Sequence, residues 1–374
     1  MPDADGPGVE ANVTGWVGPV GASKPASDYH RAMKIRRRFV SSLLAAAMLV
    51  LVAGVRAAPE KPAITLAVGG RSTLYYLPLT LAERLGYFRE EGLEVEIVDF
   101  PGGAKALQAL IGGSADVVSG AFEHTIVMQT LGQKVQAFVL QNTNPGISLG
   151  IAAAQAGRYS WPKDLKGMKV GITAPGSSTQ MFVNQLLASV GLTPDDVSYI
   201  GVGTGATAVA AMRSGRIDAL ANVEPVMTLL ERDGAMKVVV ETTTDAGTRA
   251  VFGGSLPAAT LYARASFVQQ NPATIQALTT AMVRALRWLQ KATPDEVAAV
   301  VPPEYLLGDR ALYLTALQKL RPTYSKDGRI SRVLVKNSYE VLLKSNAAVR
   351  RAPVLWLEQT YTNAFVEQAL KQLP

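Results

Sequence analysis

The chain contains no cysteine and only two histidines, His30 and His124, among its 374 residues. The absence of cysteine excludes disulfides, thiolate metal ligands and a cysteine nucleophile. Two histidines are too few for a multi-histidine metal site. A nucleophile–histidine–acid triad would have to be built on His124 alone, and the sequence offers no convincing partners for it. We therefore predict no catalytic set, no metal and no cofactor.

The chain also lacks a strongly charged run. Its net charge is +7, but the basic residues are spread along the sequence and are not interleaved with aromatic residues. This pattern argues against nucleic-acid binding. A composition of 48% hydrophobic and 18% charged residues is typical of a globular protein, and the length allows two domains.

The N-terminal part has the pattern of an export signal. Residues 1–32 are rich in glycine, proline and alanine without periodicity, which predicts disorder or an upstream extension that is not used in the cell. Lys34–Arg38 is basic, and Phe39–Val55 is apolar. We predict a signal peptide over residues 33–57, cleaved near Ala57, and a periplasmic mature protein. The 17-residue apolar stretch is short of the about 20 needed to span a bilayer, so an uncleaved anchor is the less favoured alternative. Sec and twin-arginine export both remain open.

From Ala63 onward, short apolar runs alternate with segments of helical periodicity. Such alternation predicts an α/β fold with mostly parallel sheets. The expected strands are Ile64–Val68, Glu94–Asp99, Asp116–Val118, Val135–Leu140, Ile147–Ala153, Lys169–Thr173, Val197–Ile200, Ile217–Asn222 and Lys237–Val240. Helices are expected to begin near Leu77, Ala104, Thr125, Thr179 and Ala206.

One unit of this pattern occurs twice. "GAKALQALIGGSADVV", residues 103–118, aligns with "GATAVAAMRSGRIDAL", residues 205–220, with six identities in sixteen positions. The preceding turns "ITLAVGGRST" and "VGITAPGSST" also match. Two copies are too few for a solenoid and indicate two similar lobes, with chance similarity between Ala/Gly-rich segments as the alternative.

The paired turns place Gly, Ser and Thr where strands end and helices begin. In an open parallel sheet, ligands bind at the carboxyl ends of the strands, beside helix N-termini that offer free N–H groups. Two lobes that face each other with such turns would form a polar cleft. Each Ser or Thr could instead only cap its helix.

Several further residues are candidates with alternatives. Gly201–Ala206 matches a dinucleotide-binding fingerprint and supports an enzyme as the alternative function. Asp116 and Asp218 precede strands at the end away from the cleft, so we expect them to brace turns. Glu224 could meet a cationic ligand group or a hinge amide. Tyr75 and Tyr76 are either core residues or a stacking wall, and Glu123, like His124, is placed to face the cleft or to be structural.

Three stretches of the sequence resemble a known family. "YYLPLTLAERLGYFREEGLEVEIVDFPGGAKALQALIGGSADVVSG", "WPKDLKGMKVGITAPGSST" and "GRIDALANVEP" are similar to the two lobes of periplasmic solute-binding proteins of ABC importers, in the nitrate/sulfonate/taurine branch that includes thiamine-precursor binders. The resemblance covers about residues 63–257. It implies a type II periplasmic binding protein fold, with two doubly wound α/β lobes around a ligand cleft.

The resemblance also implies a domain division, partners and a function. Lobe 1 would comprise residues 58–148 and 256–374, and lobe 2 residues 149–255, with hinges near residues 146–150 and 253–258. The protein would be a monomer that passes a small polar solute to ABC permease and ATPase subunits at the inner membrane. An extracytoplasmic sensor subunit would share the pocket. The related thiamine-pyrimidine synthases resemble a cysteine-containing, iron-binding pattern that this chain lacks.

Carried over by position, the resemblance gives a set of ligand-binding residues that lie in the turns described above. They are Ser72, Thr73, Tyr76, Gly103, Ala104, Ser119, Gly120, His124, Gln141, Asn142, Ser177, Ser178, Thr179 and Glu224. Arginine, which is common where sulfonates are bound, is scarce in these turns, with only Arg71 and Arg249 nearby. The charge of the solute therefore stays open.

Overall fold

The computed structural model describes residues 14–18, 21, 57–352 and 354–373. The predicted signal peptide therefore lies outside the described residues, apart from Ala57. The chain separates into two units, Met1–Ala57 and Ala58–Pro374, and the second contains all the helices and strands described below. In the described part of the chain, no helix is both long enough and apolar enough to cross a membrane.

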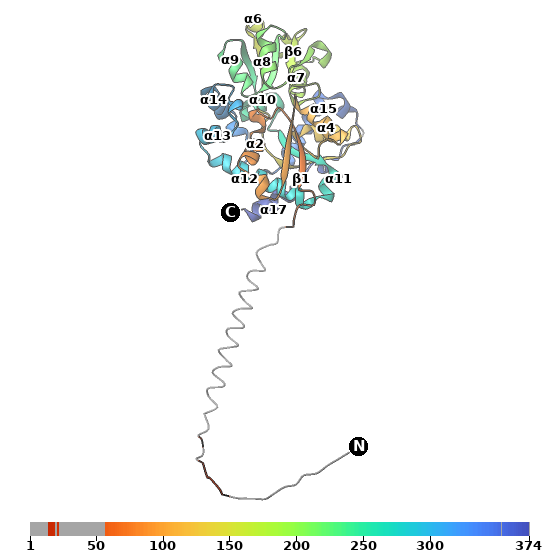
Figure 1. Cartoon of the computed structure of the whole chain (residues 1–374). Helices are drawn as coiled ribbons and strands as arrows, with labels where there is room; N and C mark the ends of the chain where they lie inside the picture. Colours follow the sequence, from red (N-terminus) through yellow and green to blue (C-terminus); the bar gives the residue numbers. More distant parts are fainter. Residues whose placement is uncertain (1–13, 19–20, 22–56, 353, 374) are drawn as a thin grey trace, which may run out of the picture. The chain divides into compact units, whose positions relative to one another are not determined.

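The described strands form two five-stranded sheets, one in each lobe (Figure 1). The first sheet has the order β2-β1-β3-β10-β4 and contains β1 (Ala63–Gly69), β2 (Glu94–Phe100), β3 (Val117–Ala121), β4 (Val135–Leu140) and β10 (Ala259–Arg264). The second has the order β7-β6-β8-β5-β9 and contains β5 (Ile147–Ala152), β6 (Lys169–Ile172), β7 (Ser198–Gly201), β8 (Ala219–Val223) and β9 (Met236–Glu241).

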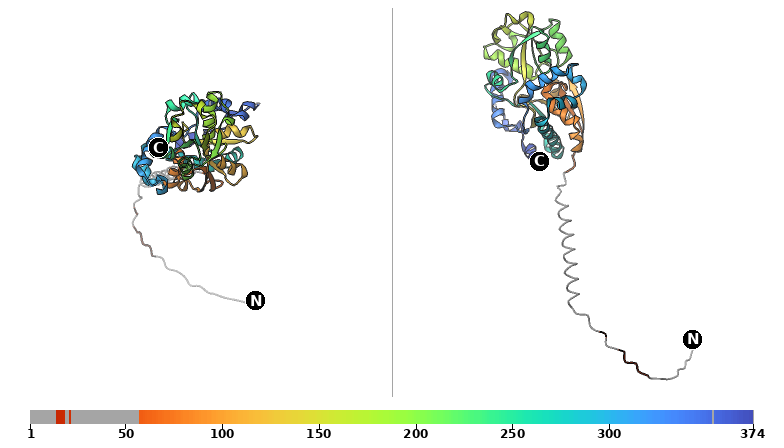
Figure 2. Two further views of the ribbon diagram at one scale, coloured as in Figure 1. Left: turned by 90° about the horizontal axis from the view of Figure 1, so that it is seen from above. Right: turned by 90° about the vertical axis from the view of Figure 1, so that its left-hand side faces the viewer.

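The two sheets share one topology, which confirms the predicted pair of similar lobes. In each, one strand is antiparallel to both its neighbours: β10 between β3 and β4, and β5 between β8 and β9. Each of these strands follows a crossing of the chain from the other lobe. The lobes lie one above the other in the right-hand view of Figure 2. The predicted limits of the two domains fall at these crossings and stay a prediction about how the chain divides.

The aspartates of the repeat have equivalent roles. Asp116 Oδ2 accepts a hydrogen bond from the Thr65 backbone N–H at 3.1 Å, before β3. Asp218 Oδ2 accepts one from the Lys169 N–H at 2.8 Å, before β8. Both carboxylates thus connect the start of one strand to the neighbouring strand, as predicted. They are part of the framework and lie away from the cleft end of the strands.

Helices cover both faces of each sheet. In the second lobe they are α6 (Ala153–Ala156), α7 (Ser178–Ser189), α8 (Ala206–Arg213), α9 (Val226–Arg232) and α10 (Asp245–Phe252). In the first lobe and the C-terminal region they are α2 (Leu77–Arg84), α3 (Tyr87–Glu90), α4 (Gly103–Gly112), α5 (Glu123–Gln129), α11 (Ala265–Gln270), α12 (Pro272–Lys291), α13 (Pro294–Val300), α14 (Arg310–Leu320), α15 (Arg332–Ser345), α16 (Ala347–Arg351) and α17 (Ala364–Gln372).

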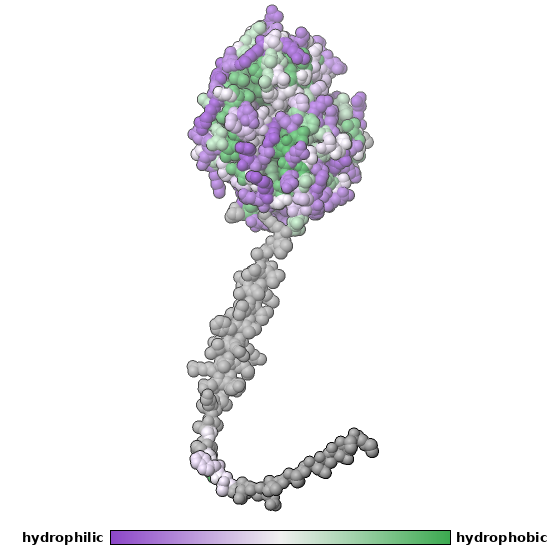
Figure 3. Space-filling model, viewed as in Figure 1, coloured by the Kyte–Doolittle hydropathy of each residue, from purple (hydrophilic) through white to green (hydrophobic). Residues whose placement is uncertain are grey.

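The central strands are buried from both sides, which explains their continuous apolar runs. Leu66 and Val68 of β1 and Val117 of β3 have no exposed surface. Helix α12 packs against α2 and α17 on one side of the first sheet, and α4 packs against β1 and β3 on the other. On the outside, hydrophilic and hydrophobic side chains are interspersed, which is typical of a surface that faces water (Figure 3).

The C-terminal helices connect the two lobes. Helix α15 packs against α7 of the second lobe and α5 of the first, and α14 packs against α9 of the second lobe and the turn Leu74–Tyr76 of the first. The sequence resemblance did not extend to these helices. The structure therefore adds a third segment of the chain to the region between the lobes.

Candidate functional site

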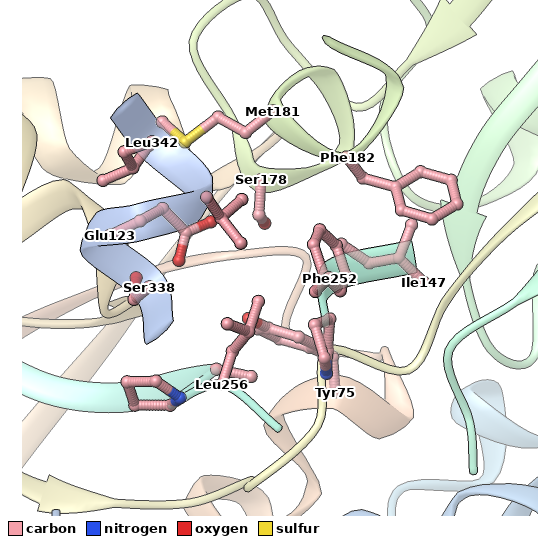
Figure 4. Close-up of a pocket in the computed structure, with 14 residues that line it drawn as sticks. Tyr75, Glu123, Ile147, Ser178, Met181, Phe182, Phe252, Leu256, Ser338 and Leu342 are labelled. Atoms are coloured by element: carbon pink, nitrogen blue, oxygen red, sulfur yellow. The ribbon is translucent and has the colours of Figure 1, made fainter. Parts of the chain in front are cut away.

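A pocket lies where the two lobes and α15 meet (Figure 4). Tyr75 and Glu123 come from the first lobe, at the ends of the turns that follow β1 and β3. Ser178 and Phe182 come from the first turns of α7 in the second lobe. The remaining lining residues are Pro145, Ile147, Met181, Phe252, Leu256, Pro257, Ala258, Ser338, Val341 and Leu342. No single lobe encloses this space.

Glu123 is the charged residue of the pocket. It is the first residue of α5 and follows the buried β3 directly, so its carboxylate is held at the carboxyl end of the first sheet. Burial raises the pKa of Glu123 to about 7, opposed only by a hydrogen bond from its own backbone N–H. Burial, with the charge of Glu123 as the next cause, also raises the pKa of Tyr75 well above its ordinary value. The polar end of the pocket is therefore acidic and incompletely solvated.

The other walls are mainly apolar. Phe182 and Phe252 lie with their ring centroids 6.1 Å apart, and Leu256 and Met181 complete this side. Figure 4 shows the Glu123 carboxylate and the Ser178 hydroxyl near each other on the same side of the space that these side chains enclose. An apolar chamber with a few directed polar groups is typical of a small-molecule site.

The pocket is small because the lobes are in contact. Its volume is about 30 Å³. That accommodates a water molecule but is far below the roughly 300 Å³ at which ligand pockets begin. A solute of more than a few atoms can enter only if the lobes move apart or the lining side chains rearrange.

His124 connects the lobes beside the pocket. Its Nε2 lies 3.3 Å from the Gly176 carbonyl oxygen, which can only accept, so Nε2 carries the proton. Its Nδ1 then accepts a hydrogen bond from the Tyr262 hydroxyl, 3.0 Å away. Burial lowers the pKa of His124 to about 4. The imidazole is therefore neutral near pH 7 and joins α5 to the turn before α7.

Two further hydrogen bonds join the lobes. The Ala104 N–H at the start of α4 donates to Ser177 Oγ at 3.0 Å, and the Leu74 N–H donates to the Glu224 carbonyl oxygen at 3.1 Å. Gly103 lies beside this contact: a Cβ at this position would be 3.5 Å from His124 Cε1 and 3.6 Å from Tyr76 Oη, which is ordinary van der Waals distance. These residues, which apart from Leu74 were predicted for the site, form the interlobe contact next to the pocket.

Of the predicted ligand-binding residues, Ser178 lines the pocket itself. In the first lobe, Thr73 Oγ1 donates to the Gly70 carbonyl at 2.8 Å, and half-buried Ser72 precedes it in the same turn. Ser119 Oγ accepts from Gln141 Nε2 at 2.9 Å, and Gly120 packs against Tyr262. The Thr73 and Ser119 hydroxyls are thus bonded within their own lobe, whereas the buried Gln141 Oε1 has no hydrogen-bond partner among the described residues.

The other predicted polar residues face the framework. Asn142 is completely buried beside Thr323, with its Oδ1 lacking a hydrogen-bond partner. Thr179 Oγ1 accepts from the Thr173 N–H at 3.0 Å, so it closes the turn before α7. Glu224 Oε2 accepts from the Thr228 N–H at 2.9 Å, on the side of α14.

Sequence reasoning missed most of the pocket wall. Met181, Phe182, Phe252, Leu256, Val341 and Leu342 have the periodicity of ordinary core residues, so no local pattern marks them as lining residues. Glu123 and Tyr75 carried a usable signal, because Glu123 comes just after β3 and Tyr75 comes after the turn that follows β1, both at the carboxyl end of the first sheet. Ser338 could not be found, because only the packing of α15 against α7 and α5 brings it to the pocket.

The turn with the dinucleotide-like fingerprint is packed against the first lobe. A Cβ at Gly70 would lie 2.4 Å from Thr204 Oγ1, and one at Gly203 would lie 3.8 Å from the Pro101 carbonyl oxygen. Gly203 has a φ of +73°, and its carbonyl accepts from Asn222. The glycines thus serve a tight turn at the lobe interface. Among the described residues, no group of three or more His, Asp or Glu side chains could hold a metal ion.

A charged cluster at the lobe interface involves a residue that sequence reasoning did not consider. Lys319 of α14 lies 2.7 Å from a Glu241 carboxylate oxygen, 3.7 Å from Glu224 and 3.9 Å from Glu231. Glu224 is fully buried, and burial raises the pKa of its carboxyl. One cation from the C-terminal region thus compensates three carboxylates of the second lobe.

We expect Lys319→Met to lower the free energy of unfolding by about 1–3 kcal/mol, because it leaves the buried Glu224 without a compensating charge. Urea denaturation at pH 7 measures this. Lys336→Met is the control: Lys336 pairs with Glu340 on the exposed face of α15, and such a pair contributes about 0.5 kcal/mol or less. Equal losses in the two variants would show that the Lys319 cluster has no special role.

Comparisons with known proteins agree with this architecture. A model of the NMT1-like family matches residues 57–301. A solved structure from Bordetella bronchiseptica RB50 is 48% identical, with a TM-score of 0.81 over 84% of this chain and 98% of that one. The alkanesulfonate-binding protein SsuA from Xanthomonas axonopodis pv. citri, bound to MOPS, is 19% identical with a TM-score of 0.62 over 82% of this chain and 99% of its own. The periplasmic binding protein fold predicted from the sequence is thereby confirmed.

Two relatives found by sequence comparison carry different kinds of name, one that of a binding protein and the other that of an enzyme. YtlA of Bacillus subtilis, which is named as a binding protein by assignment only, is 25% identical over 259 residues, which are 68% of this chain and 74% of YtlA. The 4-amino-5-hydroxymethyl-2-methylpyrimidine phosphate synthase of Schizosaccharomyces pombe is 30% identical over 162 residues, but these are only 43% of this chain and 45% of the enzyme. The sequence similarity to this enzyme therefore covers less than half of each chain, whereas the similarity to YtlA covers more than two thirds of each.

Proposed function

Because this chain belongs to the NMT1-like family, whose model spans residues 57–301, we propose that it is the solute-binding component of an ABC-type importer. It captures a small polar solute between its lobes and delivers it to a membrane permease. The observation that carries this proposal is the composition of the pocket, to which Glu123 of the first lobe and Ser178 and Phe182 of the second all contribute. A site divided in this way is completed only when the lobes close.

The closed arrangement also explains how solute binding would be signalled. The contacts from Ala104 to Ser177 and from His124 to Gly176 lie directly beside the pocket. A solute in the pocket adds contacts to both lobes at once and so favours the closed over the open arrangement. A permease that recognises both lobes could then distinguish the loaded protein from the empty one.

A thermal-shift screen of nitrate, alkanesulfonates, taurine, pyrimidines and aromatic amines tests this function. A solute that binds the folded protein at a hundred times its Kd adds about 2.7 kcal/mol to the free energy of unfolding, which raises the melting temperature by several degrees. Titration calorimetry then gives the Kd. If no solute in the screen shifts the melting temperature, whereas NAD or NADP binds with micromolar affinity, the alternative of a dinucleotide-dependent enzyme replaces the binding role.

The proposal includes export of the chain to the periplasm. The basic segment Lys34–Arg38 followed by the apolar Phe39–Val55 supports a signal peptide. We expect protein from the native host to begin at Ala58 and to be recovered in the periplasmic fraction, as intact-mass measurement would show. A chain that retains Phe39–Val55 in the membrane fraction would instead indicate an anchored protein.

A further inference from the structure

The pocket is acidic, with no compensating cation in its lining. Glu123 carries its only ionisable carboxylate, and none of the described lining residues is Lys, Arg or His. The other polar side chains are the hydroxyls of Tyr75, Ser178 and Ser338, which can rotate to accept or donate. An anionic solute would therefore have to approach a carboxylate without a basic side chain to receive it.

Aromatic rings form much of the remaining wall. Tyr75, Phe182 and Phe252 line the same space, and the rings of Phe182 and Phe252 are tilted by 58° to each other at 6.1 Å. The faces of aromatic rings carry negative electrostatic potential and attract cations. Carboxylate and rings thus favour the same sign of ligand charge.

We propose that the solute is a small organic cation: an apolar body with one ammonium or amidinium group, which donates hydrogen bonds to the Glu123 carboxylate while the body packs against Phe182, Phe252 and Leu256. This assignment rests on the proposed solute-binding function and narrows it. It disfavours nitrate and simple sulfonates as the natural solute. The hydroxyl of Ser178, on the same side of the pocket as the Glu123 carboxylate in Figure 4, can accept a further N–H.

The N-terminus of α7 is the feature that would favour an anion. Ser178 is the first residue of this 12-residue helix, and a helix N-terminus carries a partial positive charge. That partial charge is about half an elementary charge, whereas ionised Glu123 carries a full negative charge in the same pocket. In the turn before α7, the Ser177 hydroxyl already accepts a hydrogen bond from the Ala104 N–H of the first lobe. The net field in the pocket therefore favours a cation.

Three probes with similar apolar bodies and different charges test the proposal on the full protein: benzylamine, benzyl alcohol and benzenesulfonate. We expect benzylamine to bind at least about tenfold more tightly than benzenesulfonate at pH 8, as measured by calorimetry. Glu123→Gln keeps the size of the side chain but removes its charge. It should weaken benzylamine binding by about tenfold or more, because a hydrogen bond between charged groups is lost, and leave benzyl alcohol within about twofold.

Glu340→Gln is the matched control. It removes one negative charge from the exposed face of α15, where Glu340 pairs with Lys336, and should leave all three affinities unchanged. Circular dichroism and urea denaturation of both variants verify that they fold. A general effect of net charge would appear equally in both variants and would overturn the assignment to Glu123.

Other outcomes separate this proposal from the function on which it rests. If benzenesulfonate binds more tightly than benzylamine, or if taurine, an alkanesulfonate or nitrate raises the melting temperature, the proposed cation is wrong and the solute-binding function stands. If none of the probes binds at millimolar concentration and no solute of the wider screen shifts the melting temperature, both proposals fail.

Discussion

Gly69→Ala is expected to lower the free energy of unfolding by about 3 kcal/mol or more, at the upper end for a single added methyl group. A Cβ at Gly69, the last residue of β1, would lie 2.2 Å from the Gly103 nitrogen and 2.3 Å from the Gly102 carbonyl carbon. Both are backbone atoms, so no side-chain rotation relieves the clash. The start of α4, which carries the Ala104 contact to Ser177, must move. Solute affinity should therefore fall together with stability.

Gly112→Ala provides the comparison within the same helix. Gly112 is the last residue of α4, is exposed, and has no atom within 4 Å of an added Cβ. Alanine favours helical backbone over glycine, so this change should be neutral or stabilising by up to about 1 kcal/mol. Urea denaturation measures both variants. A loss below about 1 kcal/mol for Gly69→Ala would mean that α4 is not fixed against β1 as described.

Two neighbouring residues, Glu123 and His124, are expected to give the protein opposing pH dependences of stability. The pKa of Glu123 is raised from 4.5 to about 7 in the folded protein. Its favourable contribution is complete below pH 4.5 and is lost as the pH rises through about 7, because folding then has to hold a buried charge. At 1.36 kcal/mol per pKa unit, the full change amounts to about 3 kcal/mol, less where solvent reaches the carboxylate.

His124 acts in the opposite direction. Its pKa is lowered from 6.5 to about 4. Its contribution to the free energy of unfolding is complete above pH 6.5 and is lost as the pH falls through about 4. In this range the imidazole binds a proton in the unfolded chain but stays neutral when buried in the folded protein. The full change is again about 3 kcal/mol. Between about pH 4.5 and 6.5 the two slopes largely cancel, so the wild-type protein should show little net effect from this pair.

Single substitutions separate the two contributions. In Glu123→Gln, the His124 slope remains, and the free energy of unfolding should fall relative to wild type as the pH is lowered from 7 to 4. In His124→Gln, which can keep bonds to Gly176 and Tyr262, it should fall relative to wild type as the pH is raised from 4.5 to 7. Urea denaturation across this range gives both difference curves. Difference curves that are flat within error would show that neither group has a shifted pKa. Burial, with the charge of Glu123 as a further cause, raises the pKa of the neighbouring hydroxyls of Tyr75, Tyr76 and Tyr262.

The sequence predicted those elements of the fold whose signals are local. The bounds of β4, Val135–Leu140, match the prediction, and α8 begins at Ala206 as expected. Strand β10, Ala259–Arg264, was not predicted, because its place depends on pairing with β3 and β4, more than a hundred residues earlier in the chain. Periodicity reports which face of a segment is buried, but it does not report which distant partner buries it.

In the candidate site, too, the residues with a local sequence signal could be predicted, whereas those brought in by distant packing could not. Repeated Gly, Ser and Thr turns predicted a ligand region between the lobes; the structure has a pocket there, and Ser178 lines it. The hydroxyls of Thr73 and Thr179, however, are bonded within their own turns without capping a helix, a structural role that the sequence could not separate from ligand binding. Ser338 and Leu342 reach the pocket only through the packing of α15, so no motif near α7 or α5 could have indicated them.

The absence of cysteine makes the closure of the two lobes on a solute directly measurable. Lys105→Cys in α4 of the first lobe and Ala210→Cys in α8 of the second place one labelling site on each lobe at exposed positions. Thiol-reactive spin labels attach only to these two introduced cysteines, because the chain contains no other cysteine. Their separation, measured by pulsed electron spin resonance, reports the distance between the lobes with and without the solute that gives the largest thermal shift.

Without solute, we expect a broad distribution of label-to-label distances centred on a longer distance. The reason is that the pocket of the closed protein, about 30 Å³, is too small for a solute to enter. Saturating solute should convert it to a narrow distribution that is shorter by several ångströms. Adding Glu123→Gln to the labelled protein should raise the concentration of an organic cation needed for this change. A distance distribution that stays the same at saturation, with binding verified by calorimetry in the same sample, would contradict closure on a solute between the lobes.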